Sequence, residues 1–122
     1  MKIVGFLSDF GLRDSYVAEM KAVALSRCPD ATLVDISHEI PKFDVQMGAF
    51  VLASAASSFP RGSIFLAVVD PGVGSKRMPL IGQSNRSLYV GPDNGLLMLA
   101  ATREGLQSVY RIETSRYCTR AI

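Results

Sequence analysis

The alternation of short apolar runs with helical segments constrains the fold of this chain more than any other feature. The runs cover residues 2–7, 32–36 and 63–69, and each one ends at a polar or glycine-containing turn. Continuous apolar runs of this length are typical of strands that are buried on both faces. Because parallel strands are joined by helices that cross over the sheet, the pattern predicts an α/β domain with a mostly parallel sheet.

Two helices are expected between these strands. Residues 14–27 carry apolar side chains at helical spacing and stop before Pro29, with Asp14 as the expected N-cap. Residues 45–57 follow a second expected cap, Asp44, and are rich in Ala and Gly, which favours a smooth helix packed closely on the sheet. The remaining expected elements are strands at 79–81, 88–90 and 108–112 and a short helix at 94–101.

Composition and charge exclude several classes of protein. The 122 residues, 48% hydrophobic and 20% charged, allow one globular domain over residues 1–122 and do not fit a disordered, collagen-like or coiled-coil chain. A net charge of +2 is too small to indicate a nucleic-acid or membrane partner. Cys28 and Cys118 lack metal-ligand spacing, and no apolar run suits a signal peptide or a membrane span. We therefore expect a soluble, cytoplasmic protein with reduced thiols.

Acidic residues stand at the predicted ends of the strands. Asp9 follows the first strand, Asp70 follows the third, and Asp35 lies in the end of the second. In open α/β sheets, ligands bind outside the carboxyl ends of the strands, so Asp9 and Asp70 are the first candidates for a functional site. Each could equally cap the turn that follows it, and Asp35 is better explained by bonds to its own loop.

Two further side chains could take part in such a site. Arg77 lies on the return of the glycine-rich loop after Asp70, where it could hold that carboxylate in a bidentate pair or could simply be a solvated surface group. His38, the only histidine, could act as a general base oriented by Asp35. A hydrogen-bonded structural role is the commoner one for a histidine in a strand-exit loop.

Two other kinds of site are poorly supported. Residues 70–77 lack the spacing of a phosphate-binding loop, and Pro79 disfavours the helix that should follow one. A metal site built from Asp9, Asp14, His38 and Asp70 would lack the adjacent carboxylates that metal-dependent phosphatases offer, so we expect no metal.

Four segments, in order along the chain, resemble one family. They are Ser8–Lys21 (SDFGLRDSYVAEMK), Val34–Pro41 (VDISHEIP), Val68–Arg77 (VVDPGVGSKR) and Gly91–Leu97 (GPDNGLL). Together they resemble the S-adenosyl-L-methionine hydroxide adenosyltransferases, the hydrolase relatives of the fluorinases and chlorinases. The resemblance implies a three-layer, Rossmann-like N-terminal α/β domain. The family's C-terminal β-barrel domain is absent from this sequence.

The resemblance implies hydrolysis of S-adenosyl-L-methionine. Water or hydroxide attacks C5′, L-methionine leaves from the sulfonium, and adenosine is released. The sulfonium is already a good leaving group, so the site needs to align the nucleophile with C5′ and sulfur rather than supply a general acid. S-adenosyl-L-methionine is the substrate in this reaction, and no cofactor is expected.

The resemblance also implies roles for individual residues. Asp9 matches the carboxylate that binds both ribose hydroxyls, while Asp70 and Arg77 match two members of an Asp-Arg-His triad that positions or activates the water. The halogenating relatives carry Tyr in place of Asp70, which favours hydrolysis here. Phe43 falls where relatives place an aromatic ring against the ribose or adenosyl group. The other candidate substrate-binding residues, which could instead shape their loops, are Tyr16, Asp14 and Asn94.

The triad histidine and the second domain of the family would lie beyond residue 122. In the family, the site lies between the N-terminal domain of one subunit and the C-terminal domain of its neighbour in a homotrimer. Three interpretations remain open for this sequence. It is a fragment that is largely inactive alone, a hydrolase that is self-sufficient or completed by another chain, or a nucleoside-binding module without turnover.

Overall fold

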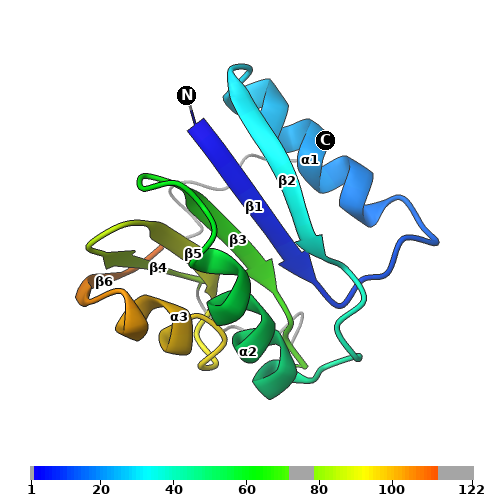
Figure 1. Ribbon diagram of the computed structural model, residues 1–122. Coiled ribbons are helices and arrows are strands. Elements are labelled where there is room, and N and C mark those ends of the chain that lie inside the picture. Colours follow the sequence, from blue (N-terminus) through cyan, green and yellow to red (C-terminus); the bar gives the residue numbers. More distant parts are fainter. Residues whose placement is uncertain (1, 72–78, 113–122) are drawn as a thin grey trace.

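Each of the three apolar runs forms a strand, and the strands in the described part of the chain join in one six-stranded sheet (Figure 1). The computed structural model describes residues 2–71 and 79–112. The strands are β1 (Lys2–Ser8), β2 (Ala31–Ser37), β3 (Ile64–Val68), β4 (Pro79–Ser84), β5 (Leu88–Pro92) and β6 (Leu106–Arg111). The helices are α1 (Tyr16–Arg27), α2 (Val45–Ala56) and α3 (Met98–Arg103).

The sheet has the strand order β2-β1-β3-β5-β4-β6. Neighbouring strands are parallel from β2 to β5, whereas β4 is antiparallel to both β5 and β6. The reversal arises at the turn between β4 and β5, where the Ser84 N–H donates to the Ser87 carbonyl over 3.0 Å and closes a hairpin. The predicted α/β architecture with a mostly parallel sheet is therefore confirmed.

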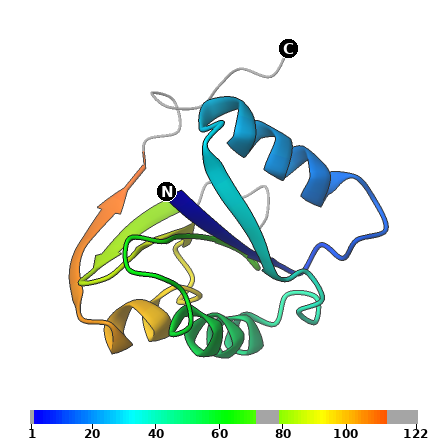
Figure 2. The same ribbon diagram turned by 45° about the horizontal axis from the view of Figure 1, so that its top comes forward.

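The helices lie on both faces of the sheet. Figure 2 shows α1 on one side and α2 with α3 on the other, which gives three layers. Most of the core lies between the sheet and the α2–α3 layer, where Leu52, Phe65 and Tyr89 are fully buried. The α1 layer is thinner. Val17 is the buried residue of α1, while Val23 and Leu25 remain exposed to solvent.

The small residues of α2 allow this helix to approach the sheet closely, as predicted. Gly48 is buried against the sheet, and a Cβ at this position would lie 2.9 Å from Leu96 Cδ1 and 3.2 Å from Val69 Cγ2. The predicted cap is also confirmed, because the Asp44 carboxylate accepts the Met47 N–H over 3.0 Å. The helix is therefore fixed at its N-terminal end, close to the carboxyl ends of the strands.

The predicted cap of α1 is wrong. The N-cap residue is Ser15, and the Asp14 carboxylate instead accepts the N–H of Tyr16 over 2.9 Å in the turn before the helix. The Ser15 hydroxyl does not cap the helix backbone and donates to the Glu19 carboxylate. The first helix therefore begins at Tyr16, one residue later than a cap at Asp14 predicts.

The last helix also begins later than predicted. It covers Met98–Arg103 rather than 94–101, because Gly95 adopts a φ of 90° and the Asn94 side chain accepts the Leu96 N–H. These two residues form a turn that an α-helix could not contain. Among the residues that the structure describes, no helix has the length and apolar character needed to cross a membrane.

Candidate functional site

Asp9 and Asp70 lie at the carboxyl ends of neighbouring parallel strands. Ser8 is paired with Val68 where β1 and β3 run side by side, and the Asp9 N–H donates to the Val68 carbonyl over 3.3 Å. Asp70 follows two residues after this carbonyl and is half-buried. The register of the sheet thus brings the two predicted acidic residues to one edge.

Asp9 is held by the backbone of Phe43. Asp9 is only 7% exposed, and its Oδ2 accepts the Phe43 N–H over 2.8 Å. Phe43 adopts a φ of 64°, the left-handed region that costs a residue other than glycine about 1–2 kcal/mol. Phe43 is 52% exposed, and the Lys42 ammonium lies 5.9 Å from the centroid of its ring. A nearly buried carboxylate is thus bonded to the backbone of a residue with an exposed aromatic side chain, a combination suited to a sugar diol and a flat or apolar group.

Asn94 makes structural contacts with both ends of its amide group. Its Nδ2 donates to the Val69 carbonyl over 2.9 Å, and its Oδ1 accepts the Leu96 N–H over 3.1 Å. The amide therefore links the end of β3, directly before Asp70, to the turn before α3. This contact fixes the backbone that carries Asp70.

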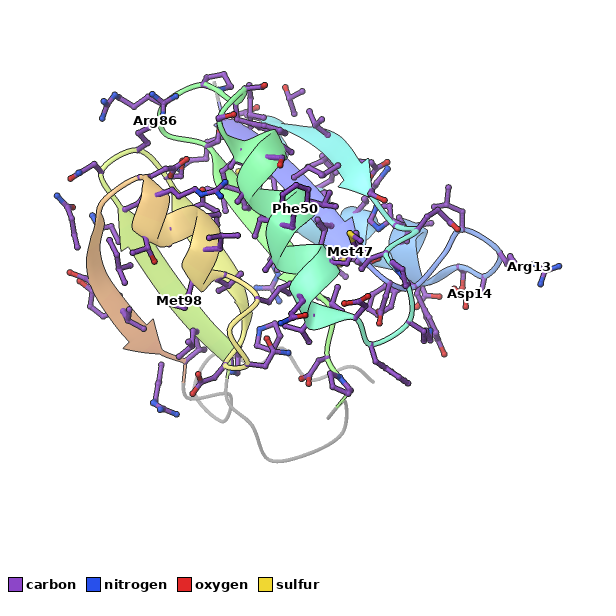
Figure 3. The ribbon with its side chains drawn as sticks, turned by 60° about the horizontal axis from the view of Figure 1, so that its bottom comes forward. Arg13, Asp14, Met47, Phe50, Arg86 and Met98 are labelled. Carbon is purple, nitrogen blue, oxygen red and sulfur yellow. The ribbon has the colours of Figure 1, made fainter. Side chains whose placement is uncertain are left out.

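Asp14 lies in the connection between β1 and α1, which projects away from the α2 side of the molecule (Figure 3), and Tyr16 is the first residue of α1. Both residues are exposed. The Tyr16 ring contacts the edge of the Phe10 ring, with centroids 6.0 Å apart. Phe10 is the residue after Asp9, so Tyr16 contacts the segment that carries the candidate site. Arg77, the other predicted catalytic residue, lies outside the described residues.

A series of hydrogen-bonded polar side chains ends at Ser8, the residue before Asp9. The Ser8 hydroxyl is 2.6 Å from His38 Nδ1, and His38 Nε2 is 2.8 Å from Asp35 Oδ1. Asp35 Oδ2 is in turn 2.5 Å from the Lys21 ammonium. The sequence allows two roles for His38, a general base oriented by Asp35 or a hydrogen-bonded structural residue, and Asp35 does contact the ring. Ser8 and Lys21 were missed as partners in this series, because they belong to β1 and α1, elements distant in sequence.

Charge complementarity stabilises the ionised form of Asp35. Partial burial alone would raise the pKa of this carboxyl, but hydrogen bonds and attraction from Lys21 and His38 outweigh it, so the pKa lies below its ordinary value. Asp35 is therefore an acceptor at neutral pH. Among the described residues, no group of three or more His, Cys, Asp and Glu side chains is arranged to hold a metal ion.

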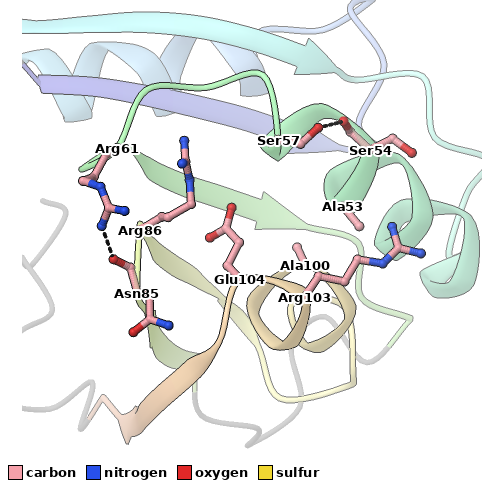
Figure 4. Close-up of a pocket in the computed structure, with 9 residues that line it drawn as sticks. All are labelled: Ala53, Ser54, Ser57, Arg61, Asn85, Arg86, Ala100, Arg103 and Glu104. Atoms are coloured by element: carbon pink, nitrogen blue, oxygen red, sulfur yellow. Dashed lines mark hydrogen bonds between the residues drawn. The ribbon is translucent and has the colours of Figure 1, made fainter.

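A hollow of about 560 Å³ lies at the opposite end of the sheet (Figure 4). Its polar lining includes Arg61, Asn85 and Arg86, which belong to the turns before β3 and β5. The Arg61 guanidinium donates to the Asn85 carbonyl over 2.7 Å, and that of Arg86 donates to the Phe59 carbonyl over 3.0 Å. These bonds tie turns together at the end of the sheet where ligands of α/β proteins rarely bind, so the strand-end carboxylates remain the candidate site.

The fold and the Asp9–Phe43 pair define an α/β domain with a candidate ligand site at the carboxyl ends of its parallel strands. Comparison with known proteins identifies the family. The model of the SAM hydroxide adenosyltransferase N-terminal domain matches residues 4–121. The chain belongs to this family.

Curated relatives carry the names of two activities. An (R)-S-adenosyl-L-methionine hydrolase of Thermus thermophilus is 44% identical over 95% of this chain and 45% of its own length. A hydrolase of the same name from Methanocaldococcus jannaschii is 38% identical over 96% of this chain and 46% of its own. A fluorinase of Nocardia brasiliensis is more distant, at 28% identity. The chain thus spans less than half the length of these relatives.

Solved structures share the fold. A crystal structure of an uncharacterized conserved protein from Thermotoga maritima superposes with a TM-score of 0.87 at 38% identity, over 93% of this chain and 44% of the other. A conserved hypothetical protein from Thermus thermophilus superposes with a TM-score of 0.85 at 43% identity, over 96% of this chain and 49% of the other.

Proposed function

We propose that this chain provides the N-terminal part of the active site of an adenosine-forming S-adenosyl-L-methionine hydrolase. In this reaction water attacks C5′, the C5′–sulfur bond breaks, L-methionine leaves with the electron pair, and the proton of the water is released to solvent as adenosine forms. The observation that carries the proposal is the Asp9–Phe43 pair at the carboxyl end of β1. The names of the hydrolase relatives support it.

Asp9 is the proposed ribose-binding residue. Its Oδ2 is already bonded to the Phe43 N–H, which fixes the carboxylate plane and leaves acceptor sites for two adjacent hydroxyls. Phe43, whose backbone binds this carboxylate and which is half exposed, would contact the ribose or adenosyl group with its ring. Fixing the ribose ring also places C5′, because this carbon is bonded directly to ring carbon C4′.

Asp70 and Arg77 are the proposed water-positioning pair. Arg77 remains charged at neutral pH and cannot act as a base, so its role would be to orient the Asp70 carboxylate and stabilise developing charge. Asn94 would assist by fixing the backbone next to Asp70 through the Val69 carbonyl. Asp14 and Tyr16 would shape the loop that follows Asp9.

The remaining contacts to adenine and methionine would come from outside these residues. The relatives are more than twice as long as the matched region, which is consistent with a site completed by a further domain in a homotrimer. The cytoplasm, where S-adenosyl-L-methionine is made, is the proposed location. Nucleic acid and membranes are not among the proposed partners.

A second candidate function is nucleoside binding without turnover. It is favoured by one observation, that the Asp9–Phe43 pair lies wholly within this chain although the chain spans only 45% of the Thermus thermophilus relative. The two functions are separated by calorimetric titration with S-adenosyl-L-methionine and adenosine, combined with chromatographic detection of released methionine. Release of methionine supports the hydrolase, with the Thermus thermophilus relative as positive control. Binding without release supports the module.

The ribose assignment is tested with Asp9→Asn. Loss of one charged acceptor should weaken adenosine binding about tenfold or more. The same variant should bind 2′,3′-dideoxyadenosine as the unaltered protein does, since that ligand lacks the diol. Asp30→Asn, at an exposed position in the turn before β2, is the matched control. Equal adenosine affinity in Asp9→Asn and the unaltered protein contradicts the assignment.

A further inference from the structure

Four side chains from three elements and a loop form one continuous polar chain behind the candidate site. It runs from the Lys21 ammonium on α1, through Asp35 on β2 and His38 in the following loop, to the Ser8 hydroxyl at the end of β1. Ser8 is fully buried and His38 is 3% exposed. Burying polar groups is costly unless each is hydrogen-bonded, so the buried members of this polar chain must keep their partners.

The donors and acceptors of the chain match in one arrangement. Asp35 is ionised and can only accept, so His38 donates its Nε2–H to this carboxylate. In the neutral ring, Nδ1 then accepts the Ser8 hydroxyl proton. The Ser8 oxygen keeps a free lone pair, and it accepts the Phe10 N–H over 3.3 Å. Every group is hydrogen-bonded in this arrangement. The arrangement fixes Ser8 and Phe10, and Asp9 is the residue between them.

Serine, histidine and aspartate in contact also occur in hydrolases with a nucleophilic serine, but this geometry does not serve that chemistry. Ser8 is fully buried, so no substrate can reach its oxygen. That oxygen also accepts a hydrogen bond from the Phe10 N–H. The polar chain is therefore built to hold the backbone rather than to attack a substrate.

The polar chain joins the two segments whose contact forms the candidate site. One segment, residues 8–11, carries Asp9, and the other, residues 38–43, carries Phe43. Besides the Ser8–His38 bond, the Gly11 N–H donates to the His38 carbonyl over 2.7 Å. Phe43 then donates its strained backbone N–H to Asp9. The approach of the two segments sets the position of the Asp9 carboxylate.

We propose that His38, fixed between Ser8 and Asp35, is a positioning residue that aligns the Asp9 carboxylate with the Phe43 N–H and thereby orders the ribose-binding site. The proposal rests on the proposed function for the identity of the ligand. The positioning of Asp9 in the free protein can be measured without any ligand.

Ser8→Ala is the first test variant, because it removes one hydroxyl and leaves His38 Nδ1 and the Phe10 N–H without their partner. Ser63→Ala is the matched control. Ser63 is also buried, at 2% exposure, but it directly precedes β3 at the opposite end of the sheet, where its hydroxyl donates to the Pro60 carbonyl over 2.6 Å. Thermal unfolding of both variants reports the general cost of losing a buried hydroxyl.

The first measurement is hydrogen exchange of the Phe43 amide, followed by NMR in the ligand-free chain. The Ser8→Ala variant should exchange this proton about tenfold faster than both the unaltered protein and Ser63→Ala. The variant His38→Ala should do the same. The variant His38→Gln, whose amide keeps a donor for Asp35 and an acceptor for Ser8, should restore slow exchange. An unchanged Phe43 amide in Ser8→Ala and His38→Ala overturns the proposal.

The second measurement is the affinity for adenosine relative to 2′,3′-dideoxyadenosine. Ser8→Ala should lose about tenfold of adenosine affinity and retain its affinity for the dideoxy compound. If the unaltered protein does not distinguish the two ligands, the proposed function fails, and the exchange rate of the Phe43 amide still decides the positioning proposal. If His38→Ala does not fold, Ser8→Ala and His38→Gln carry the test.

Discussion

The backbone of Phe43 offers a prediction that separates the two roles of this residue. Phe43 holds a φ of 64°, where a side chain clashes with its own backbone, and the residue is 52% exposed. Phe43→Gly removes both the ring and the clash, whereas Phe43→Ala removes only the ring. The difference between the two variants therefore reports the strain of the left-handed backbone, less the additional conformational entropy that glycine loses on folding.

The magnitude follows from the conformation. Glycine avoids the left-handed cost of about 1–2 kcal/mol but loses about 0.5–1 kcal/mol more in conformational entropy on folding. Phe43→Gly should therefore be more stable than Phe43→Ala by about 0.5–1 kcal/mol. For a domain of this size that difference corresponds to a melting temperature higher by roughly 2–4 °C.

Urea unfolding of the two variants measures this difference, and calorimetric titration with adenosine measures the loss of the ring. Both variants should bind adenosine about tenfold more weakly, because an aromatic contact with a nucleoside is worth on the order of 1–3 kcal/mol. Phe43→Tyr, which keeps the ring, is the control for binding. If Phe43→Ala proves as stable as Phe43→Gly, the backbone of Phe43 is not strained and this reasoning is refuted.

Two further predictions concern stability. Gly91→Ala should destabilise the fold by about 3 kcal/mol or more, since its Cβ would lie 2.5 Å from the Ala67 carbonyl oxygen. Gly82→Ala, with no neighbour nearer than 3.9 Å, should cost about 1 kcal/mol or less. Thermal unfolding of both variants checks this difference, and equal melting temperatures would contradict it. The lowered pKa of Asp35 means that its pairing with Lys21 stabilises the fold above the ordinary carboxyl pKa of 3.8 and is lost as pH falls through the folded-state value. The stability advantage of the unaltered protein over Asp35→Asn, from urea unfolding at about pH 6 and about pH 2.5, should therefore shrink at the lower pH, and an advantage that grows there would refute the argument.

The sheet could be predicted from the sequence because its strands are locally marked. Apolar runs with a polar ending identify a buried strand without knowledge of its neighbours, and residues 2–7 and 63–69 became β1 and β3 with ends shifted by one residue or less. The cap at Asp44 was equally local, since it depends on a residue three positions away. The cap at Asp14 failed because Asp14 and Ser15 compete for the same helix start, and their propensities alone do not separate them.

The candidate site was only partly predictable. That Asp9 and Asp70 share an edge followed from strand polarity, which the alternation of strands and helices already implied. The backbone contact of Phe43 with Asp9 did not, because it depends on a left-handed conformation that sequence rarely reveals for phenylalanine. The bond from the Asn94 amide to the Val69 carbonyl could not be predicted either, because it depends on the tertiary contact between the end of β3 and the turn before α3.

The sequence by itself therefore determined the order and type of the main elements, the strand ends at which acidic residues gather, and the family to which the chain belongs. Tertiary structure alone decided which of those residues meet and what holds them. The polar chain takes its side chains from α1, β2, a loop and β1, namely Lys21, Asp35, His38 and Ser8. They form one series of bonds only because β1 and β2 are paired side by side and the helix and the loop lie next to them. Local preferences act over a few residues, whereas a site is made by contacts between segments far apart in sequence.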